Sequence, residues 1–213
     1  MADVPTLLRL DSSASGDASV TRRLTDAFEQ AWRARGASYD VVARDLHADP
    51  VPHLETSALH WAPGTRPEGS VPAEAAALQQ TLVDELLAAD VLVVGVPVYN
   101  YAAPSTLKAW IDRVHVPGWT TGPTTRPLAG RPAVLATASG IAYDEGSPTE
   151  GHEHAVPALE VVLGTALGMW VEVVAARYTL AAEVPELAPM RHRGEQELTD
   201  ALARLADLGA TLT

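Results

Sequence analysis

The sequence of 213 residues contains no cysteine, which excludes disulfide bonds, thiolate nucleophiles, iron–sulfur clusters and zinc–thiolate centres. It has one lysine, Lys108, and its formal charge of −12 would repel the backbone of a nucleic acid. No apolar run approaches the roughly 20 residues that a membrane-spanning helix needs. The start of the chain has no basic region followed by an apolar run, so we expect no secretory signal and a cytoplasmic protein.

The composition that remains is that of a globular protein. Apolar residues make up 47% and charged residues 20% of the chain, which is enough apolar material for one sizeable core. A chain of this length favours one domain over two. We therefore expect residues 1–213 to form a single domain.

One apolar stretch stands at the centre of the predicted fold. Residues 91–96 include four valines and a leucine, and Asp90 precedes them, which is typical of a strand buried on both faces. Such a strand belongs in the middle of a parallel sheet. It leads directly into the turn Pro97-Val98-Tyr99-Asn100-Tyr101.

The rest of the chain alternates between strand and helix patterns. Further strands are predicted at residues 6–10, 38–43, 132–137 and 169–175, and helices at 19–35, 74–88, 104–114, 155–167 and around 198–208. This alternation predicts an α/β three-layer sandwich whose parallel five-stranded sheet has the order 2-1-3-4-5. Residues 45–70 show no period and predict a long connection. On the helix at 104–114, we expect Lys108, Asp112 and Arg113 to face outward.

The loop after the first strand has the features of a phosphate site. Residues 12–21 carry several hydroxyl groups, and Ser19 is a good N-cap for the helix that follows. The free amides and positive dipole end of that helix favour an anion. The alternative is a plain serine-rich turn. The loop contains neither the dinucleotide fingerprint nor the ATP-type phosphate loop.

Two further loops end at the same edge of the predicted sheet. After the central strand, Tyr99 and Tyr101 suit the faces of a flat heteroaromatic ligand, Asn100 suits its polar edge, and Pro97 stiffens the turn. The alternative is that both tyrosines only cap the sheet. After the fourth strand, the small residues at 138–140 would let backbone amides approach a ligand. We expect the three loops to form one site.

Several motifs match a known enzyme family: the Ser-Ser and Ser-x-Thr elements of the first loop, Val42-Ala43-Arg44-Asp45-Leu46, Pro97-Val98-Tyr99-Asn100-Tyr101, Leu107-Lys108-x-Trp110-Ile111-Asp112, and Gly140 with Gly146-Ser147-Pro148. With these, the chain resembles the FMN-dependent NADH azoreductases and related NAD(P)H:quinone oxidoreductases. The resemblance implies the flavodoxin-like fold. It also implies that NADH or NADPH reduces quinones or azo compounds through FMN, in a ping-pong transfer of two electrons.

The resemblance also assigns residues to the cofactor. The FMN phosphate would lie against Ser13, Ser19, Val20 and Thr21. The flavin ring would lie against Pro97, Val98, Tyr99, Asn100 and Tyr101, and against Ala138, Ser139, Gly140 and Ile141. Family members are commonly homodimers in which aromatic residues of the partner cover the flavin, which suggests Trp61, Trp119 and Trp170 for that role.

The chain departs from the family pattern in its third loop. The family usually has Ser-Arg-Gly-Gly where this chain has Ala-Ser-Gly-Ile at residues 138–141, and Tyr143 replaces a histidine. Tyr143 is thus a weak candidate proton donor, and no other catalytic side chain is assigned. A dedicated flavin reductase acting on one quinone or N–N metabolite remains an alternative, as does an electron carrier without small-molecule turnover.

Two other patterns carry less weight. The residues His152-Glu153-His154 place two imidazoles at i,i+2 with no third ligand evident, so we predict no metal site. Ser139 precedes Gly140 without the G-x-S-x-G turn of a serine hydrolase.

Overall fold

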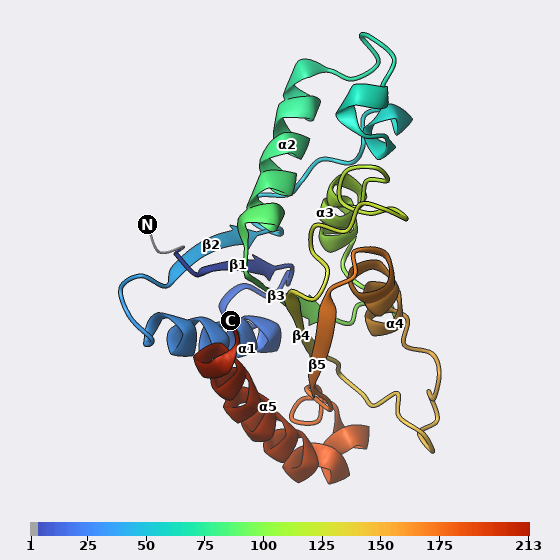
Figure 1. The fold of residues 1–213 in the computed structure, drawn as a ribbon. Helices are drawn as coiled ribbons and strands as arrows, with labels where there is room; N and C mark the ends of the chain where they lie inside the picture. The colour runs from blue at the N-terminus through green and yellow to red at the C-terminus, as the bar shows by residue number, and fades with distance from the viewer. Residues whose placement is uncertain (1–3) are drawn as a thin grey trace.

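A five-stranded parallel sheet in the order β2-β1-β3-β4-β5 forms the centre of the computed structural model, which describes residues 4–213 (Figure 1). The strands are β1 (Thr6–Asp11), β2 (Asp40–Asp45), β3 (Val91–Pro97), β4 (Pro132–Ala138) and β5 (Trp170–Ala176). The predicted strand order and the parallel sheet are confirmed.

Helices cover both faces of this sheet. They are α1 (Val20–Arg33), α2 (Ala73–Ala88), α3 (Ser105–Val114), α4 (Ala155–Leu159) and α5 (Arg191–Thr211). Helices α1 and α5 lie on one face and α2, α3 and α4 on the other (Figure 1). The side chains of each group form an apolar core with the strands. The three-layer α/β sandwich is therefore confirmed.

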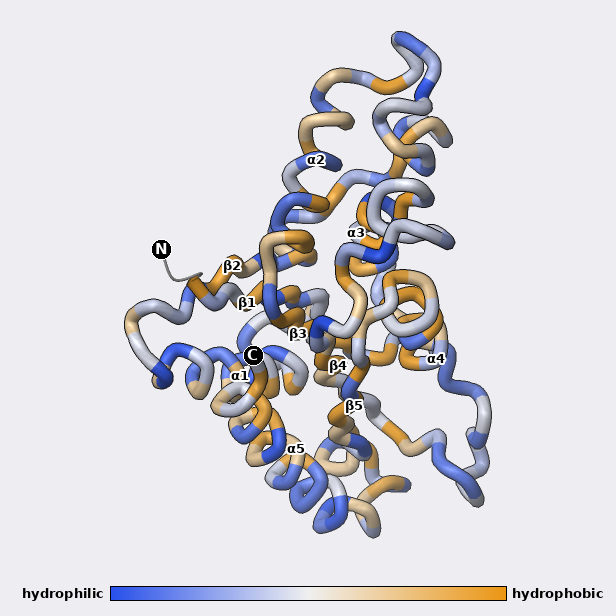
Figure 2. Tube along the Cα trace, viewed as in Figure 1, coloured by the Kyte–Doolittle hydropathy of each residue, from blue (hydrophilic) through white to orange (hydrophobic). Residues whose placement is uncertain are grey.

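Strand β3 is buried along its whole length because it has a helical layer on each side. Leu92 and Val94 belong to the core under α2, α3 and α4, whereas Val91 and Val93 belong to the core under α1 and α5. Figure 2 shows the apolar residues concentrated along the strands and hydrophilic residues over much of α5. Each fully buried aliphatic side chain of this kind stabilises the fold by about 1.5–3 kcal/mol.

Two elements differ from the sequence-based expectation. Strand β2 starts two residues later than expected, because it pairs with β1 from Thr6 opposite Asp40 to Asp11 opposite Asp45. The helix expected at 155–167 is α-helical only to Leu159. It continues as a π-helix over Glu160–Ala166, and the amide of Leu167 donates to the carbonyl of Val162, five residues back.

The prediction that Arg113 faces outward is wrong. Its side chain is fully buried, donates to the carbonyl oxygens of Pro52 and Ala75, and pairs with Glu55 at 2.8 Å. The reason is that the long connection between β2 and α2 folds over α3 and covers it. A buried guanidinium is tolerated only when it is paired and hydrogen-bonded, so Arg113 ties this connection to α3.

Helix α5 crosses α1 at Gly209, and this contact gives a stability prediction. A Cβ atom at Gly209 would overlap the carbonyl oxygen of Phe28 in α1. Gly209→Ala should therefore lower the free energy of unfolding by about 1–3 kcal/mol, although alanine is the better helix former. Urea unfolding measures this. The neighbouring exposed substitution Ala210→Ser serves as control and should stay within about 0.5 kcal/mol of the parent; an equal effect of both would contradict the close contact.

Candidate functional site

A cavity of about 360 Å³ lies at the carboxyl edge of the sheet. Its walls come from four connections, those after β1, β3, β4 and β5. The lining residues are Ser13, Ser15, Ala18, Ser19, Val20, Thr21, Pro97, Val98, Tyr99, Ala138, Gly140, Thr179, Leu180 and Glu183. The structure thus brings together residues from all three predicted loops and adds a fourth segment. We call this space the edge cavity.

The first loop gives the edge cavity its polar end. Ser19 is the N-cap of α1, and its Oγ accepts a hydrogen bond from the amide of Arg22 at 3.2 Å. The hydroxyl groups of Ser19 and Thr21 lie 3.1 Å apart. The first amides of a helix have no acceptor within the helix, so Val20 and Thr21 offer N–H groups where the dipole is positive. This arrangement suits an anion such as a phosphate.

A buried carboxylate lies behind the first loop. Asp11, at the end of β1, is only 6% exposed, accepts a hydrogen bond from Thr25 at 2.7 Å, and pairs with Arg9 at 2.8 Å. Burial raises the pKa of Asp11, and the positive charge of Arg9 opposes this rise. A Cβ atom at Gly95 would lie 3.1 Å from the Asp11 carboxylate, so a residue without a side chain suits this position in β3.

Arg22 connects the first loop to the end of β2. The sequence analysis missed this role. The Nη2 atom of Arg22 donates to the carbonyl oxygen of Ser13 at 3.2 Å and pairs with Asp45 at 2.7 Å. The hydrogen bond from Arg22 lowers the pKa of Asp45 to about 2. Because Asp45 and Asp11 compensate the charge of the guanidinium, its role at the first loop is to hold the backbone at Ser13.

In the second loop, Tyr99 turns its hydroxyl toward the first loop. The hydroxyl oxygen lies 3.2 Å from Ser13 Oγ and accepts from the amide of Ala14 at 3.1 Å. Burial works to raise the pKa of Tyr99, but the hydrogen bonds, that with Ser13 foremost, outweigh it and leave the pKa below its ordinary value. Tyr99 therefore joins the two loops as well as lining the cavity.

The turn that follows Tyr99 is strained. Asn100 and Tyr101 have φ values of 48° and 70°, in the left-handed region that non-glycine residues seldom adopt. Reciprocal backbone hydrogen bonds between Tyr99 and Ala102 close the turn. Neither Asn100 nor Tyr101 is among the described residues that line the edge cavity. Tyr101 is half exposed, and its ring lies 6.1 Å from that of Tyr143, edge to face.

The third loop divides its residues among three cavities. Ala138 and Gly140 line the edge cavity, whereas Ser139 and Tyr143 line a neighbouring space of about 330 Å³. Ile141 lines a larger cavity of about 460 Å³.

The fourth segment joins β5 to α5 and packs on the third loop. A Cβ atom at Gly140 would lie 2.5 Å from Cδ1 of Leu180, so any other residue here would push the Leu180 side chain aside. The amides of Thr179 and Leu180 donate to the carbonyls of Ser139 and Gly140 at 3.1 and 3.4 Å. The sequence analysis missed this segment. It could have been predicted, because β5 ends at the same edge of the sheet as β4 and the connection after it must start there.

Comparison with known proteins shows the family and the fold of the chain. Residues 5–198 match the family described as having the flavodoxin-like fold. A protein of Kineococcus radiotolerans named FMN-dependent NADH:quinone oxidoreductase is 51% identical over 210 residues, which cover 98% of this chain and all of that relative. A protein of the same name from Streptomyces avermitilis is 37% identical over 95% of this chain and 96% of its own length.

The chain belongs to the flavodoxin-like family of FMN-dependent NADH:quinone oxidoreductases. Among solved structures, an azoreductase from Bacillus anthracis superposes with a TM-score of 0.77 at 22% identity, over 97% of this chain and 99% of that one. Another Bacillus anthracis structure, an FMN-dependent NADH-azoreductase in complex with FMN, gives 0.76 at 18%, over 97% and 100%. These likenesses to azoreductases concern the fold.

The edge cavity of this quinone oxidoreductase family member fits FMN. Its polar end offers the helix amides and hydroxyl groups that a phosphate needs. Away from the helix terminus it is lined by Pro97, Val98, Ala138 and Gly140, apolar or small residues that suit a flat ring, and by Leu180, whose side chain lies against Gly140.

The residues His152-Glu153-His154 have a structural role at the start of α4. The carboxylate of Glu153 accepts from the amide of Val156 at 2.9 Å and so caps α4. Within residues 4–213, no three histidine, aspartate or glutamate side chains lie together in a way that would hold a metal ion. No helix in the described part of the chain is long and apolar enough to cross a membrane.

The Tyr99 hydroxyl gives a prediction for cofactor affinity. Tyr99→Phe removes the bond between the two loops, so FMN should bind roughly 3- to 10-fold more weakly, as expected for one hydrogen bond. Quenching of FMN fluorescence on titration measures the dissociation constant. Tyr39→Phe makes the same chemical change on the far side of α1, where Tyr39 packs on Trp32, and should leave FMN affinity unchanged. Equal affinities for all three proteins would contradict the assigned role.

The ion pair between Arg22 and Asp45 predicts a pH dependence of stability. Because the folded-state pKa of Asp45 is lowered to about 2, the pair stabilises the fold above the ordinary aspartate pKa, and this stabilisation is lost as the pH falls toward 2. The free energy of unfolding of the parent should exceed that of Asp45→Asn by a constant amount from pH 7 to about 4.5. Below about pH 4.5 this difference should shrink. Urea unfolding at several pH values measures it. Ser38→Ala, an exposed substitution that removes no titratable group, is the control, and its stability difference from the parent should not change with pH.

Proposed function

We propose that residues 1–213 act as one FMN-binding domain that uses NADH to reduce quinones, and azo compounds as secondary acceptors. The observation that carries the proposal is the edge cavity, which combines an anion-binding helix terminus with a flat, glycine-containing wall. The relatives named FMN-dependent NADH:quinone oxidoreductase support the cofactor, the reductant and the acceptor.

The side chains of the cavity would bind and orient the cofactor. Ser13, Ser19 and Thr21 would hold the phosphate together with the amides of Val20 and Thr21. The contacts that we propose for the flavin ring are Pro97, Val98, Tyr99, Asn100, Tyr101, Ala138, Ser139, Gly140 and Ile141. Of these, Pro97, Val98, Tyr99, Ala138 and Gly140 line the edge cavity. When bound, FMN supplies the hydride and electron chemistry, so the protein needs no acid–base pair of its own.

Tyr143 stays in the proposal as a proton donor to be tested. Burial and the neighbouring Tyr101 raise its pKa, so the phenol is protonated at neutral pH, as a donor must be. Its side chain lines the 330 Å³ space next to the edge cavity, together with Ser139 and Val98. Val98 lines both spaces, which supports a test of Tyr143 as a group close to the cofactor.

We further propose a homodimer and a cytosolic location. Exposed aromatic rings support the dimer, because such rings are enriched at interfaces: Trp61 is 59% and Trp170 48% exposed, whereas Trp119 is half-buried. The absence of cysteine and the acidic composition support the location. Sedimentation velocity of the FMN-loaded protein tests the dimer.

A spectroscopic and kinetic experiment tests the function. The purified protein reconstituted with FMN should show a bound-flavin spectrum that NADH bleaches without oxygen, and menadione should restore it. Steady-state NADH oxidation with menadione should exceed that of free FMN by at least about tenfold. Replacing NADH by NADPH, and menadione by methyl red, measures the preference for each substrate. Bound FMN without turnover above free FMN would instead support an electron carrier, and a protein that binds no FMN would overturn the proposal.

A further inference from the structure

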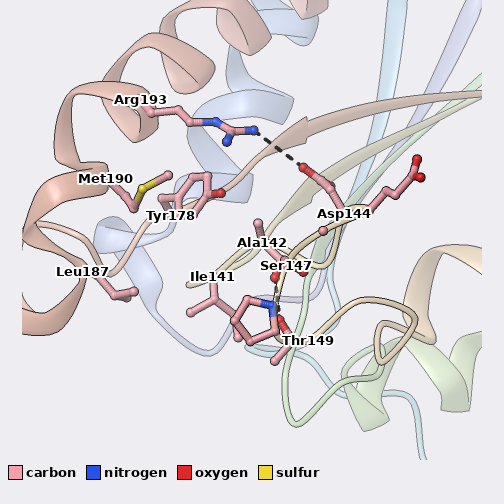
Figure 3. Close-up of a pocket in the computed structure, with 12 residues that line it drawn as sticks. Ile141, Ala142, Asp144, Ser147, Thr149, Tyr178, Leu187, Met190 and Arg193 are labelled. Carbon is pink, nitrogen blue, oxygen red and sulfur yellow. Dashed lines mark hydrogen bonds and ion pairs between the residues drawn. The ribbon is translucent and has the colours of Figure 1, made fainter.

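A second cavity, of about 460 Å³, is lined by residues that adjoin those of the edge cavity in the sequence; Figure 3 shows its lining residues. We call it the side cavity. It lies between residues 141–149, which follow β4, and the segment that runs from Tyr178 to Arg193. Its volume is in the range of pockets that hold small organic ligands, and it is lined by residues outside the proposed phosphate site.

Most of its wall is apolar. Ile141 and Ala142 come from the third loop, and Leu187 and Met190 face them from the segment before α5 (Figure 3). The ring of Tyr178 completes this wall. Tyr178 has a φ of 58°, and the guanidinium of Arg193 lies 5.0 Å from the centre of its ring, a cation–π contact that fixes its position.

One polar group in this wall lacks a hydrogen-bond partner. The Oγ atom of Ser147 is buried and has no partner within residues 4–213. Buried hydroxyl groups are usually satisfied, and this one is closed off from solvent, so it would donate to a ligand in the cavity only after its side chain rotates toward the cavity. A ligand carbonyl oxygen has the required chemistry.

The charges at the mouth of the side cavity favour a neutral ligand. Asp144 pairs with Arg177 and lies 3.7 Å from Arg193, while Glu197 pairs with both arginines at 2.8 and 3.0 Å. The two cations are thus compensated by two carboxylates. Glu145 also lines the cavity, which leaves the mouth acidic on a chain whose formal charge is −12. A sulfonate or carboxylate would be repelled there.

We propose that the side cavity is a second binding site for a neutral, planar carbonyl compound of the quinone class. The apolar walls would pack on its rings, and the hydroxyl of Ser147 would donate to one carbonyl oxygen. The two cavities share no lining residue, but Ile141 and Tyr178 of this site directly adjoin Gly140 and Thr179 of the edge cavity, so it would hold an acceptor near the cofactor. The choice of a quinone rests on the proposed function, whereas the cavity itself does not.

The NMR signals of methionine methyl groups report directly on binding in the side cavity. The chain has three methionines, of which Met190 lines the side cavity and Met169 is buried in the core under α4. We would label the methionine methyl groups with 13C in the oxidised, FMN-loaded protein, without nicotinamide, and assign Met190 with Met190→Leu. The probes are 1,4-naphthoquinone and its 2-sulfonate. With no cysteine in the chain, thiol adducts of the quinone cannot form.

The expected result is a saturable shift of the Met190 signal by 1,4-naphthoquinone, with Met169 unchanged. Ser147→Ala should raise the quinone concentration at the titration midpoint roughly 3- to 10-fold, as for one lost hydrogen bond. The exposed control Ser38→Ala should not change it. Leu187→Trp, which fills the cavity, should abolish the shift while the thermal unfolding midpoint shows that the protein is folded. The sulfonate should bind at least about tenfold more weakly.

Three results would overturn the proposal: a Met190 signal that does not move, the same midpoint in Ser147→Ala as in the parent, or equal binding of the sulfonate. Failure here is distinct from failure of the proposed function. Turnover of NADH with menadione and a silent Met190 signal would reject the second site alone. A saturable Met190 shift in a protein without turnover would reject the proposed function and leave the site in place.

Discussion

The buried carboxylate of Asp11 is the interaction on which the geometry of the site depends. An ionised carboxylate away from water is costly unless it is paired and hydrogen-bonded, and Asp11 has both kinds of partner, Arg9 in its own strand and Thr25 in α1. Thr25 can reach it only if α1 lies close to the sheet. This proximity requires the absence of a side chain at Gly95 in β3, since a Cβ there would approach both Asp11 and Thr25. The position of the N-terminus of α1 over the sheet follows from these contacts.

From this point, polar contacts extend outward and order the loops of the edge cavity. Arg22, one turn from the start of α1, connects the first loop to Asp45 at the end of β2. Tyr99 connects the same loop to the turn after β3. Each bond joins residues far apart in the sequence, so ordering one loop orders its neighbour. The cavity is therefore largely formed before a ligand enters, which lowers the entropy cost of binding.

The features that the sequence predicts well are those set by local pattern and by topology. The valines of β3 indicate a strand buried on both faces, and Ser19 indicates the start of α1. The convergence of three loops follows from the order of the parallel strands, because their carboxyl ends share one edge. These rules need no knowledge of which side chains meet.

The features that the sequence does not predict depend on partners that are distant along the chain. Helical spacing places Arg113 on the outer side of α3, but the carbonyl of Pro52 and the carboxylate of Glu55 arrive from the long connection and cover it. No periodicity of α3 contains that information. Leu180 is a similar case, since its contact with Gly140 arises only when the segment after β5 turns back over the third loop. The edge position of β5 predicts the segment but not the residue.

The third loop gives a physical meaning to the departure of this chain from its family's pattern. Glycine remains at position 140, where the side chain of Leu180 leaves no room for a Cβ. The next residue, Ile141, has its bulk in the wall of the side cavity, opposite Leu187 and Met190. A large aliphatic residue at position 141 therefore builds an apolar surface next to the cofactor cavity without narrowing it. The unusual residue thus shapes the side cavity, whereas the glycine before it is the residue against which Leu180 packs.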